Sequence, residues 1–217
     1  MEIDYTGVFY DALRNLEFQD EVFLIKELKC LQKNSFFMGP AFTTFGERVD
    51  SSGYDKVDKI RLKMYDPRVI PKGSVVVLQT NDNSVAHAGD ITLKIYKRLG
   101  AVAFVTDGLV RDSVLIANNG IKCFCKGMTP VDALNRWALT KYNIPVEIQG
   151  VKIGPGQIIV GDSDGIIAIP KGTTTAVLEK AMEIFEKENI VRATVMSCST
   201  TNLQKNLMQE YKKYGRW

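Results

Sequence analysis

Alternating strand and helix patterns in the middle of the chain constrain its fold most strongly. Residues 74–80, 101–106 and 121–125 are apolar runs of the kind that form buried strands. Residues 91–99 have apolar side chains at mostly helical spacing, and residues 113–118 can form a second, short helix. This order of strands and helices predicts right-handed βαβ units and a parallel sheet.

Segments on both sides of this region add further helices and strands. Helical spacing is found in residues 11–16, 21–31, 173–192 and 202–214. Short strands joined by Gly, Pro and Asp turns are expected at residues 146–153, 157–160 and 165–169. Residues 36–45 have the composition of a strand that Gly39-Pro40 interrupts. The fold class expected from these elements is α/β, with a mixed central sheet flanked by helices.

The length of the chain limits its domain organisation. A chain of 217 residues corresponds to one domain or at most two small ones, and it can bury a sizeable core. No low-complexity linker divides it. We expect a single domain over residues 1–217, with C-terminal helices at about residues 173–217 that can pack on a neighbouring subunit.

Charge and cysteine usage exclude several classes of protein. Lys and Arg number 28 against 25 Asp and Glu, a net charge of +3, which gives no electrostatic case for a dedicated nucleic-acid binder. No apolar run approaches membrane-spanning length, and the N-terminus has no apolar signal core. Cys123 and Cys125 alternate on an expected strand, so both thiols are expected to point into the core. We expect a soluble cytoplasmic protein with no membrane partner.

The turn Gly89-Asp90-Ile91-Thr92 opens the helix expected at residues 91–99. Free backbone N–H groups and the helix dipole make such a turn a ready site for a carboxylate or phosphate. Gly89 would let the backbone approach a ligand closely. The simpler alternative is a well-capped helix with no ligand, which the pattern alone favours.

Arg111 and Asp112 follow the strand at residues 101–106 after a short turn. Arg supplies a planar fork for a carboxylate, and Asp supplies a hard oxygen ligand for Mg²⁺. The alternative is a surface Arg beside an Asp that caps the next helix. Because neighbouring parallel strands end at the same edge of a sheet, we expect Arg111-Asp112 to lie beside the turn at Gly89.

His87 is the only histidine, so any Ser-His-Asp or Cys-His arrangement would have to use it. No G-x-S-x-G elbow or catalytic cysteine signature accompanies it. We therefore expect His87 to lie in a solvated loop near the cleft. The chain also has no P-loop and no G-x-G-x-x-G between strand and helix, which argues against a nucleotide site.

Three stretches resemble the RraA-like family, which includes class II pyruvate aldolases and a regulator of RNase E activity. They are Gly89-Asp90 at a helix start, residues 100–112 with the string Asp-Gly-Leu-Val-Arg-Asp, and residues 150–170. The resemblance implies a single swivelling-type (phosphohistidine-domain-like) α/β domain. It also implies a homotrimer or hexamer whose active site lies between subunits.

The resemblance assigns roles to individual residues of this chain. Asp112 would hold Mg²⁺ or Mn²⁺, partly through waters, and Arg111 would bind the carboxylate and keto side of the substrate. Asp90 would orient a catalytic water, and Glu188 matches a glutamate that a neighbouring chain contributes. The pyruvoyl carboxylate would be received by the backbone of Gly89, Asp90, Ile91 and Thr92.

The activity implied is divalent-metal-dependent cleavage of 4-hydroxy-4-methyl-2-oxoglutarate, or a similar 2-oxo dicarboxylate, to pyruvate by a retro-aldol reaction. Oxaloacetate decarboxylation is the expected side activity. Such a reaction needs a cation as electron sink, positive charge where the enolate develops, and a group that moves a proton. One alternative is a non-catalytic protein-interaction regulator of a ribonuclease, and another is a related lyase or hydratase acting on a different acid.

Overall fold

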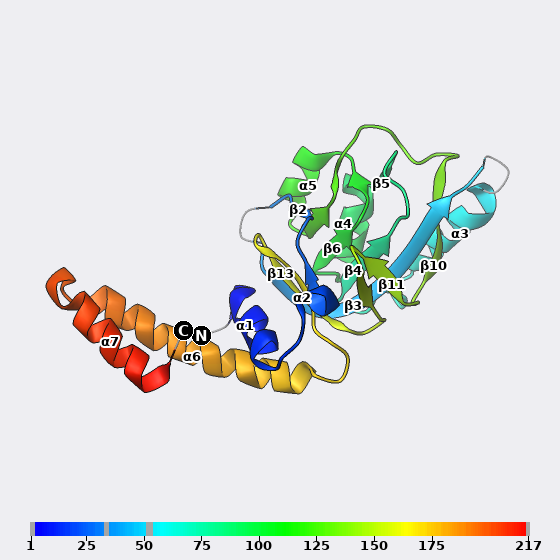
Figure 1. The fold of residues 1–217 in the computed structure, drawn as a ribbon. Helices are drawn as coiled ribbons and strands as arrows, with labels where there is room; N and C mark the ends of the chain where they lie inside the picture. The colour runs from blue at the N-terminus through cyan, green and yellow to red at the C-terminus, as the bar shows by residue number, and fades with distance from the viewer. Residues whose placement is uncertain (1–2, 33–34, 51–53, 216–217) are drawn as a thin grey trace. The chain divides into compact units, whose positions relative to one another are not determined.

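A computed structural model describes residues 3–32, 35–50 and 54–215. The chain divides into two units: residues 19–171 form one, and the two ends of the chain, residues 1–18 and 172–217, form the other (Figure 1). The expectation of one domain over residues 1–217 stays a prediction.

The larger unit is built on a mixed sheet. In the described residues nine strands form it, in the order β1-β14-β13-β3-β4-β6-β8-β2, with β10 paired to β3. The strands are β1 (Leu24–Ile25), β2 (Lys29–Cys30), β3 (Phe37–Arg48), β4 (Val75–Gln79), β6 (Ala103–Thr106), β8 (Lys122–Cys125), β10 (Trp137–Tyr142), β13 (Ile158–Asp162) and β14 (Gly165–Ala168). β3, β4, β6 and β8 run parallel, which confirms the parallel core expected from the βαβ pattern.

A second, three-stranded sheet continues the parallel strands. It consists of β5 (Ala86–Ala88), β7 (Leu109–Val110) and β9 (Gly127–Met128) in the order β5-β7-β9, all parallel. In chain order β5 follows β4, β7 follows β6 and β9 follows β8, so each leaves the main sheet and enters the small one. Helix α4 (Asp90–Arg98) begins after β5, and helix α5 (Ser113–Asn119) begins after β7. The small sheet therefore places two helix starts next to each other.

The two faces of the main sheet bury separate cores. Along β4 the side chains alternate, so that Val76 and Leu78 join one core while Val75 and Val77 join the other. The first core includes side chains of α4 and α5, and the second includes the hairpin β11 (Val146–Ile148) and β12 (Val151–Ile153). Cys123 and Cys125 both lie in the first core, as expected from their alternation. Helix α3 (Tyr54–Met64) contacts β10.

Two sequence expectations near the N-terminal side are wrong. The helix expected at residues 21–31 is reduced to α2 (Asp20–Phe23), because Leu24 and Ile25 pair with β14 at the sheet edge. The strand expected to break at Gly39-Pro40 runs without interruption. Pairing with β4 begins only at Ala41, so Pro40 costs no hydrogen bond on that side. A Cβ on Gly39 would lie 2.1 Å from the carbonyl oxygen of Gly73, and glycine allows that close approach.

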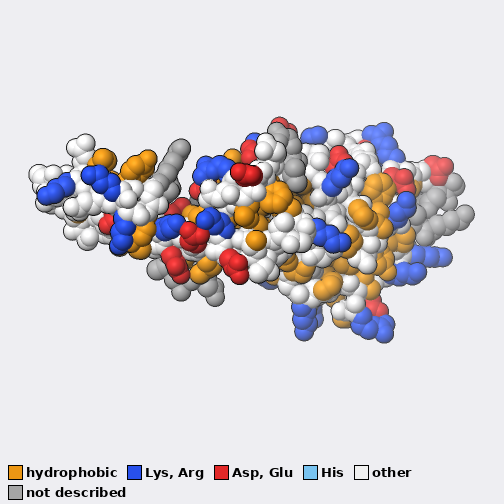
Figure 2. All heavy atoms as spheres, turned by 60° about the horizontal axis from the view of Figure 1, so that its bottom comes forward, with side chains coloured by type: hydrophobic (Ala, Val, Ile, Leu, Met, Phe, Trp, Pro, Cys, Tyr) orange, Lys and Arg blue, Asp and Glu red, His pale blue; other side chains and the backbone are white. Residues whose placement is uncertain are grey.

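The smaller unit is helical. It contains α1 (Gly7–Asn15), α6 (Thr174–Ser197), a 3₁₀ turn η1 (Thr200–Asn202) and α7 (Leu203–Tyr214). α1 buries Val8, Phe9, Ala12 and Leu13 and packs on α6. α7 contacts α6 yet has no fully buried residue, and Figure 2 shows hydrophobic side chains at the surface of this part of the molecule, among lysine and arginine side chains. Within the described ranges, no helix is both long and apolar enough to span a bilayer.

Candidate functional site

The starts of α4 and α5 meet at the end of the small sheet. The backbone N–H of Arg111 donates to the carbonyl oxygen of Ala88 at 3.0 Å, which continues the β5–β7 ladder. Two residues after Ala88 and one residue after Arg111, the backbone N–H of Asp90 donates to Oδ2 of Asp112 at 3.3 Å. The two turns singled out in the sequence therefore lie in contact, as expected, although they leave the small sheet rather than the main one.

Gly89 makes this contact possible because it has no side chain. A Cβ at this position would lie 2.7 Å from Oδ2 of Asp112 and 3.2 Å from Cγ of Arg111. The backbone of Gly89 is extended, with φ of −138°, so the requirement is for space and not for an unusual backbone angle. Any larger residue would push the Arg111-Asp112 pair away from the start of α4.

Asp112 adopts a left-handed backbone conformation, with φ of 60° and ψ of 35°, and makes no side-chain cap on α5. The alternative in which Asp112 caps the next helix is thus wrong. The side chain turns towards Asp90 instead, and its Oδ2 lies 3.7 Å from Nε of Arg111. Both side chains stay accessible, since Asp112 is 39% and Arg111 is 47% exposed. They combine a carboxylate and a guanidinium at one accessible point.

Asp90 differs from Asp112 because its carboxylate is buried. Its side chain is only 7% exposed, and Nζ of Lys94 donates to its Oδ2 at 2.7 Å. Within the part of the chain that the structure describes, Oδ1 has no hydrogen-bond partner. A buried carboxylate oxygen without a partner is costly in a purely structural role. Lys94 was not among the residues predicted for the site, although its i,i+4 spacing from Asp90 is a readable signal for a helical ion pair.

The first turn of α4 presents further donors. Leu93 makes the first hydrogen bond of this helix, to the carbonyl oxygen of Gly89 at 3.1 Å, so the N–H groups of Ile91 and Thr92 precede it. Ile91 is 74% exposed. The start of α4 therefore has the geometry of an anion site.

Asp112 fits a divalent cation held by one protein ligand. Among the described residues, no three His, Cys, Asp or Glu side chains group closely enough to enclose a metal ion. A full protein cage is not needed for Mg²⁺, which usually keeps several waters and takes one or two carboxylates together with substrate oxygens. The accessible carboxylate of Asp112 supplies an oxygen ligand of that type.

Glu188 belongs to the other unit. It lies on α6, where its Oε2 accepts hydrogen bonds of 2.5 Å from the hydroxyl of Tyr5 and from Arg192. Burial, with the neighbouring Glu188 carboxylate, raises the pKa of Tyr5 to about 12. The expected role of Glu188 in the site of a neighbouring chain stays a prediction.

His87 is buried on β5, so the expectation of a solvated loop is wrong. Its side chain has no exposed surface, and its ring packs edge-on against Trp137 at 4.7 Å between centroids. Burial lowers the pKa of His87 despite the nearby carboxylate of Asp82. The apolar neighbours Val85, Ala86 and Ala88 are the signal in the sequence that indicates a buried strand at His87.

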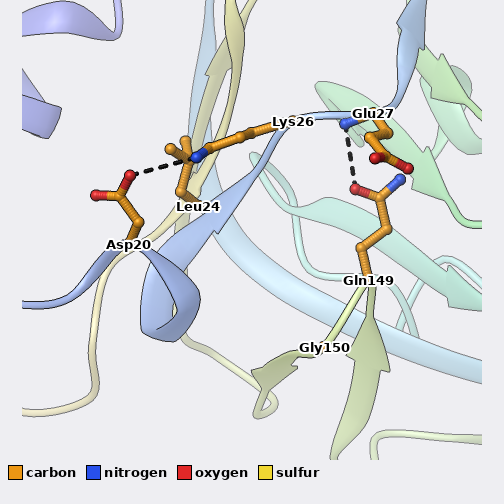
Figure 3. Close-up of a pocket in the computed structure, with 6 residues that line it drawn as sticks. All are labelled: Asp20, Leu24, Lys26, Glu27, Gln149 and Gly150. Atoms are coloured by element: carbon orange, nitrogen blue, oxygen red, sulfur yellow. Dashed lines mark hydrogen bonds and ion pairs between the residues drawn. The ribbon is translucent and has the colours of Figure 1, made fainter.

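A separate open pocket of about 540 Å³ lies elsewhere on the larger unit (Figure 3). Lys26 pairs with Asp20 at 3.3 Å, and Oε1 of Gln149 accepts the backbone N–H of Glu27 at 3.2 Å. Among the described residues that line this pocket, none is proposed for chemistry. We place the candidate site at the start of α4 and α5, where the charged groups converge.

The fold and site define an α/β protein with an acidic pair and an arginine at two adjoining helix starts. The family model described as RraA-like (Aldolase/RraA) matches residues 6–168, and the chain belongs to this family. A protein of Halalkalibacterium halodurans named "Putative 4-hydroxy-4-methyl-2-oxoglutarate aldolase" is 35% identical over 158 residues, which are 73% of this chain and 71% of that protein.

Two solved structures show the same fold. An uncharacterized protein from Pseudomonas syringae pv. tomato is 24% identical with a TM-score of 0.76, covering 93% of this chain and 92% of that chain. Streptomyces coelicolor RraAS2, described as an unusual member of the RNase ES inhibitor RraA protein family, is 23% identical with a TM-score of 0.73, covering 86% and 90%. At these identities the likeness establishes the fold alone.

Proposed function

We propose that this protein is a divalent-metal-dependent lyase that releases pyruvate from 4-hydroxy-4-methyl-2-oxoglutarate or a similar 2-oxo dicarboxylate. The observation that carries the proposal is that Asp112 contacts both Asp90 and Arg111 beside Gly89, which has no side chain to keep them apart. The name of the Halalkalibacterium halodurans relative supports the choice of reaction. Oxaloacetate decarboxylation is the side activity, because it leaves the same pyruvate fragment.

The substrate's 2-oxo acid end binds at the start of α4. The N–H groups of Ile91 and Thr92 and the helix dipole receive the carboxylate. The Arg111 guanidinium, which is half-exposed beside Asp112, contacts the carboxylate and keto side and stabilises the negative charge that develops there.

Asp112 holds the divalent cation, directly or through water. When bound, the cation acts as a Lewis acid that withdraws electrons from the 2-oxo acid. Asp112 is suited to this task because it is accessible, and the N–H of Asp90 fixes its Oδ2. Mg²⁺ and Mn²⁺ both suit a carboxylate and water environment.

Asp90 orients the water that moves the proton. Lys94 binds Oδ2, so Oδ1, which has no partner in the described part of the chain, is the oxygen that accepts a hydrogen bond from water. An ion pair at one oxygen and a free acceptor at the other give the carboxylate a defined direction. No Schiff-base lysine is needed in this scheme.

The finer architecture belongs to the same proposal. We expect the mixed sheet to be of the swivelling, phosphohistidine-domain-like type, and the protein to assemble as a homotrimer or hexamer. In that assembly Glu188 of one chain completes the site of the next.

The test is pyruvate formation across a panel of 2-oxo acids, with and without added Mg²⁺ or Mn²⁺. We expect turnover of 4-hydroxy-4-methyl-2-oxoglutarate and slower turnover of oxaloacetate, both abolished by EDTA and restored by either cation. Turnover that survives EDTA would contradict the metal-dependent mechanism. No turnover of any 2-oxo acid, together with tight binding to a ribonuclease, would establish the non-catalytic alternative instead.

A further inference from the structure

The pairing of β5 with β7 is irregular at His87. Ala86 pairs with Leu109 and Ala88 pairs with Val110, so β5 advances two residues while β7 advances one. His87 is the additional residue, and such an insertion is a β-bulge. The same two strands lead directly into Gly89 and Arg111, so their register decides which groups meet at the candidate site.

The imidazole of His87 bridges the two strands. Its Nδ1 accepts a hydrogen bond from the backbone N–H of Leu109 at 3.2 Å. Its Nε2 lies 3.2 Å from Oδ2 of Asp82. Because Leu109 is the donor in the first contact, Nδ1 must carry a lone pair, and the ring proton sits on Nε2 and is donated to Asp82.

The surroundings of the ring keep it neutral and fixed. Asp82 is committed to an ion pair with Arg48 at 2.7 Å, and Arg61 of α3 adds positive charge that opposes a proton on the ring. Burial of the ring is the largest cause that lowers the pKa of His87, and it outweighs the Asp82 carboxylate, which raises this pKa. The imidazole also packs closely against Gly108, because a Cβ on Gly108 would lie 2.4 Å from Nδ1 of His87.

We propose that His87 is a positioning residue whose neutral imidazole replaces a strand carbonyl at the bulge and so sets the register of β5 against β7. The bulge would otherwise leave the Leu109 N–H unpaired inside the protein. With Leu109 held, the next ladder bond, from Arg111 N–H to the carbonyl oxygen of Ala88, forms in place. That bond puts Asp112 over Gly89. The consequence for catalysis rests on the proposed function, whereas the register claim does not.

The first experiment uses the unaltered protein, because a single histidine gives a single imidazole signal. In ¹⁵N-labelled protein we expect Nδ1 to resonate as an unprotonated acceptor and Nε2 as an N–H. The tautomer is expected to persist well below pH 6.5, the ordinary pKa of histidine. A proton on Nδ1, or titration near the ordinary value, would overturn the proposal whether or not any variant folds.

The second experiment is a matched pair of variants. In His87→Asn, Oδ1 occupies the place of Nδ1 and can still accept from Leu109, whereas in His87→Gln the amide nitrogen retains only the contact with Asp82. We measure amide hydrogen exchange at Leu109 and Arg111, with Val77 of β4 as the internal reference. We expect exchange at both sites to be roughly fivefold to tenfold faster in His87→Gln, the factor for one lost hydrogen bond, and close to the unaltered protein in His87→Asn.

Turnover of 2-oxo acids follows the same order if the proposed function holds. We expect kcat/KM to fall more in His87→Gln than in His87→Asn at matched stability. A protein with no turnover at all would refute the proposed function, and the exchange data would still decide the register claim. Equal exchange in the two variants, or faster exchange in His87→Asn, would overturn the proposal that His87 sets the register of β5 against β7.

Discussion

The backbone N–H of Asp90 donates a hydrogen bond to Oδ2 of Asp112, 3.3 Å away. Asp90 is the first residue of α4, and Asp112 immediately precedes α5, so this one bond joins two helix starts that lie 22 positions apart in the chain. The two carboxylates also differ in their surroundings. The Asp90 carboxylate is buried, and one of its oxygens has no partner among the described residues, whereas the Asp112 carboxylate is accessible and has one oxygen held by a hydrogen bond.

Replacing Asp112 tests the metal ligand. We expect Asp112→Asn to lower kcat/KM by about 10²-fold or more, because a neutral amide holds a hard cation poorly. The side chain is 39% exposed, so stability should change little. Metal affinity measured by calorimetry in parallel should fall together with the activity. Unchanged turnover in this variant would remove the proposed mechanism.

Gly89→Ala tests the close approach at the site. The added Cβ would lie 2.7 Å from Oδ2 of Asp112 and must displace it, so we expect a loss of activity of about tenfold or more with a small change in melting temperature. Gly154→Ala is the matched control, since the nearest atom to its Cβ is 4.0 Å away. Similar kinetics in the two variants would show that the Gly89 contact does not matter for turnover.

Lys94→Met tests the ion pair on Asp90. Removing the ammonium leaves the buried carboxylate with neither oxygen paired by a side chain, which we expect to cost about 1–3 kcal/mol in the free energy of unfolding and to reduce kcat. Lys94→Arg should recover most of the lost stability and most of the lost kcat, because the positive charge of arginine reaches the same oxygen of Asp90. Urea denaturation and steady-state kinetics give the two values. Full activity in Lys94→Met would show that Asp90 needs no such partner.

Acid should destabilise the protein through His87. Its pKa is lowered in the folded state, so below pH 6.5 the unfolded chain binds a proton that the folded chain does not, and the free energy of unfolding falls as the pH falls. The slope from this group is at most about 1.4 kcal/mol per pH unit. Urea titrations between pH 7 and 5, compared with His87→Asn, isolate it from the carboxylates. Identical slopes in the two proteins would mean that His87 titrates normally.

Mixing two inactive variants tests whether Glu188 acts in a neighbouring chain. In an oligomer assembled from Asp112→Asn and Glu188→Gln chains, about a quarter of the shared sites have both residues intact, so activity should reappear after unfolding and refolding together. Glu188→Gln also tests the Tyr5 and Arg192 contacts, which it leaves in place sterically. Mixtures as inactive as the separate variants would place Glu188 outside the site.

Local patterns predicted much of the central fold. The β-branched run of β4 and the apolar spacing of α4 are readable because each element is long enough to show a period. The helix predicted at residues 21–31 was wrong, because Leu24 and Ile25 pair with the edge of the sheet instead of continuing a helix. The two-residue strands β7 and β9 show no period at all, so β5-β7-β9 could not be foreseen.

The sequence by itself determined which residues could meet. Gly89-Asp90 and Arg111-Asp112 are local motifs, and the order of strands and helices already sends both to one edge of a sheet. The tertiary structure alone decided how they meet: a bulge at His87, a left-handed Asp112 and a buried Asp90 with one oxygen that no described residue contacts by a hydrogen bond. Register, burial and unpaired acceptors depend on neighbours distant in the chain, and no local pattern of residues encodes them.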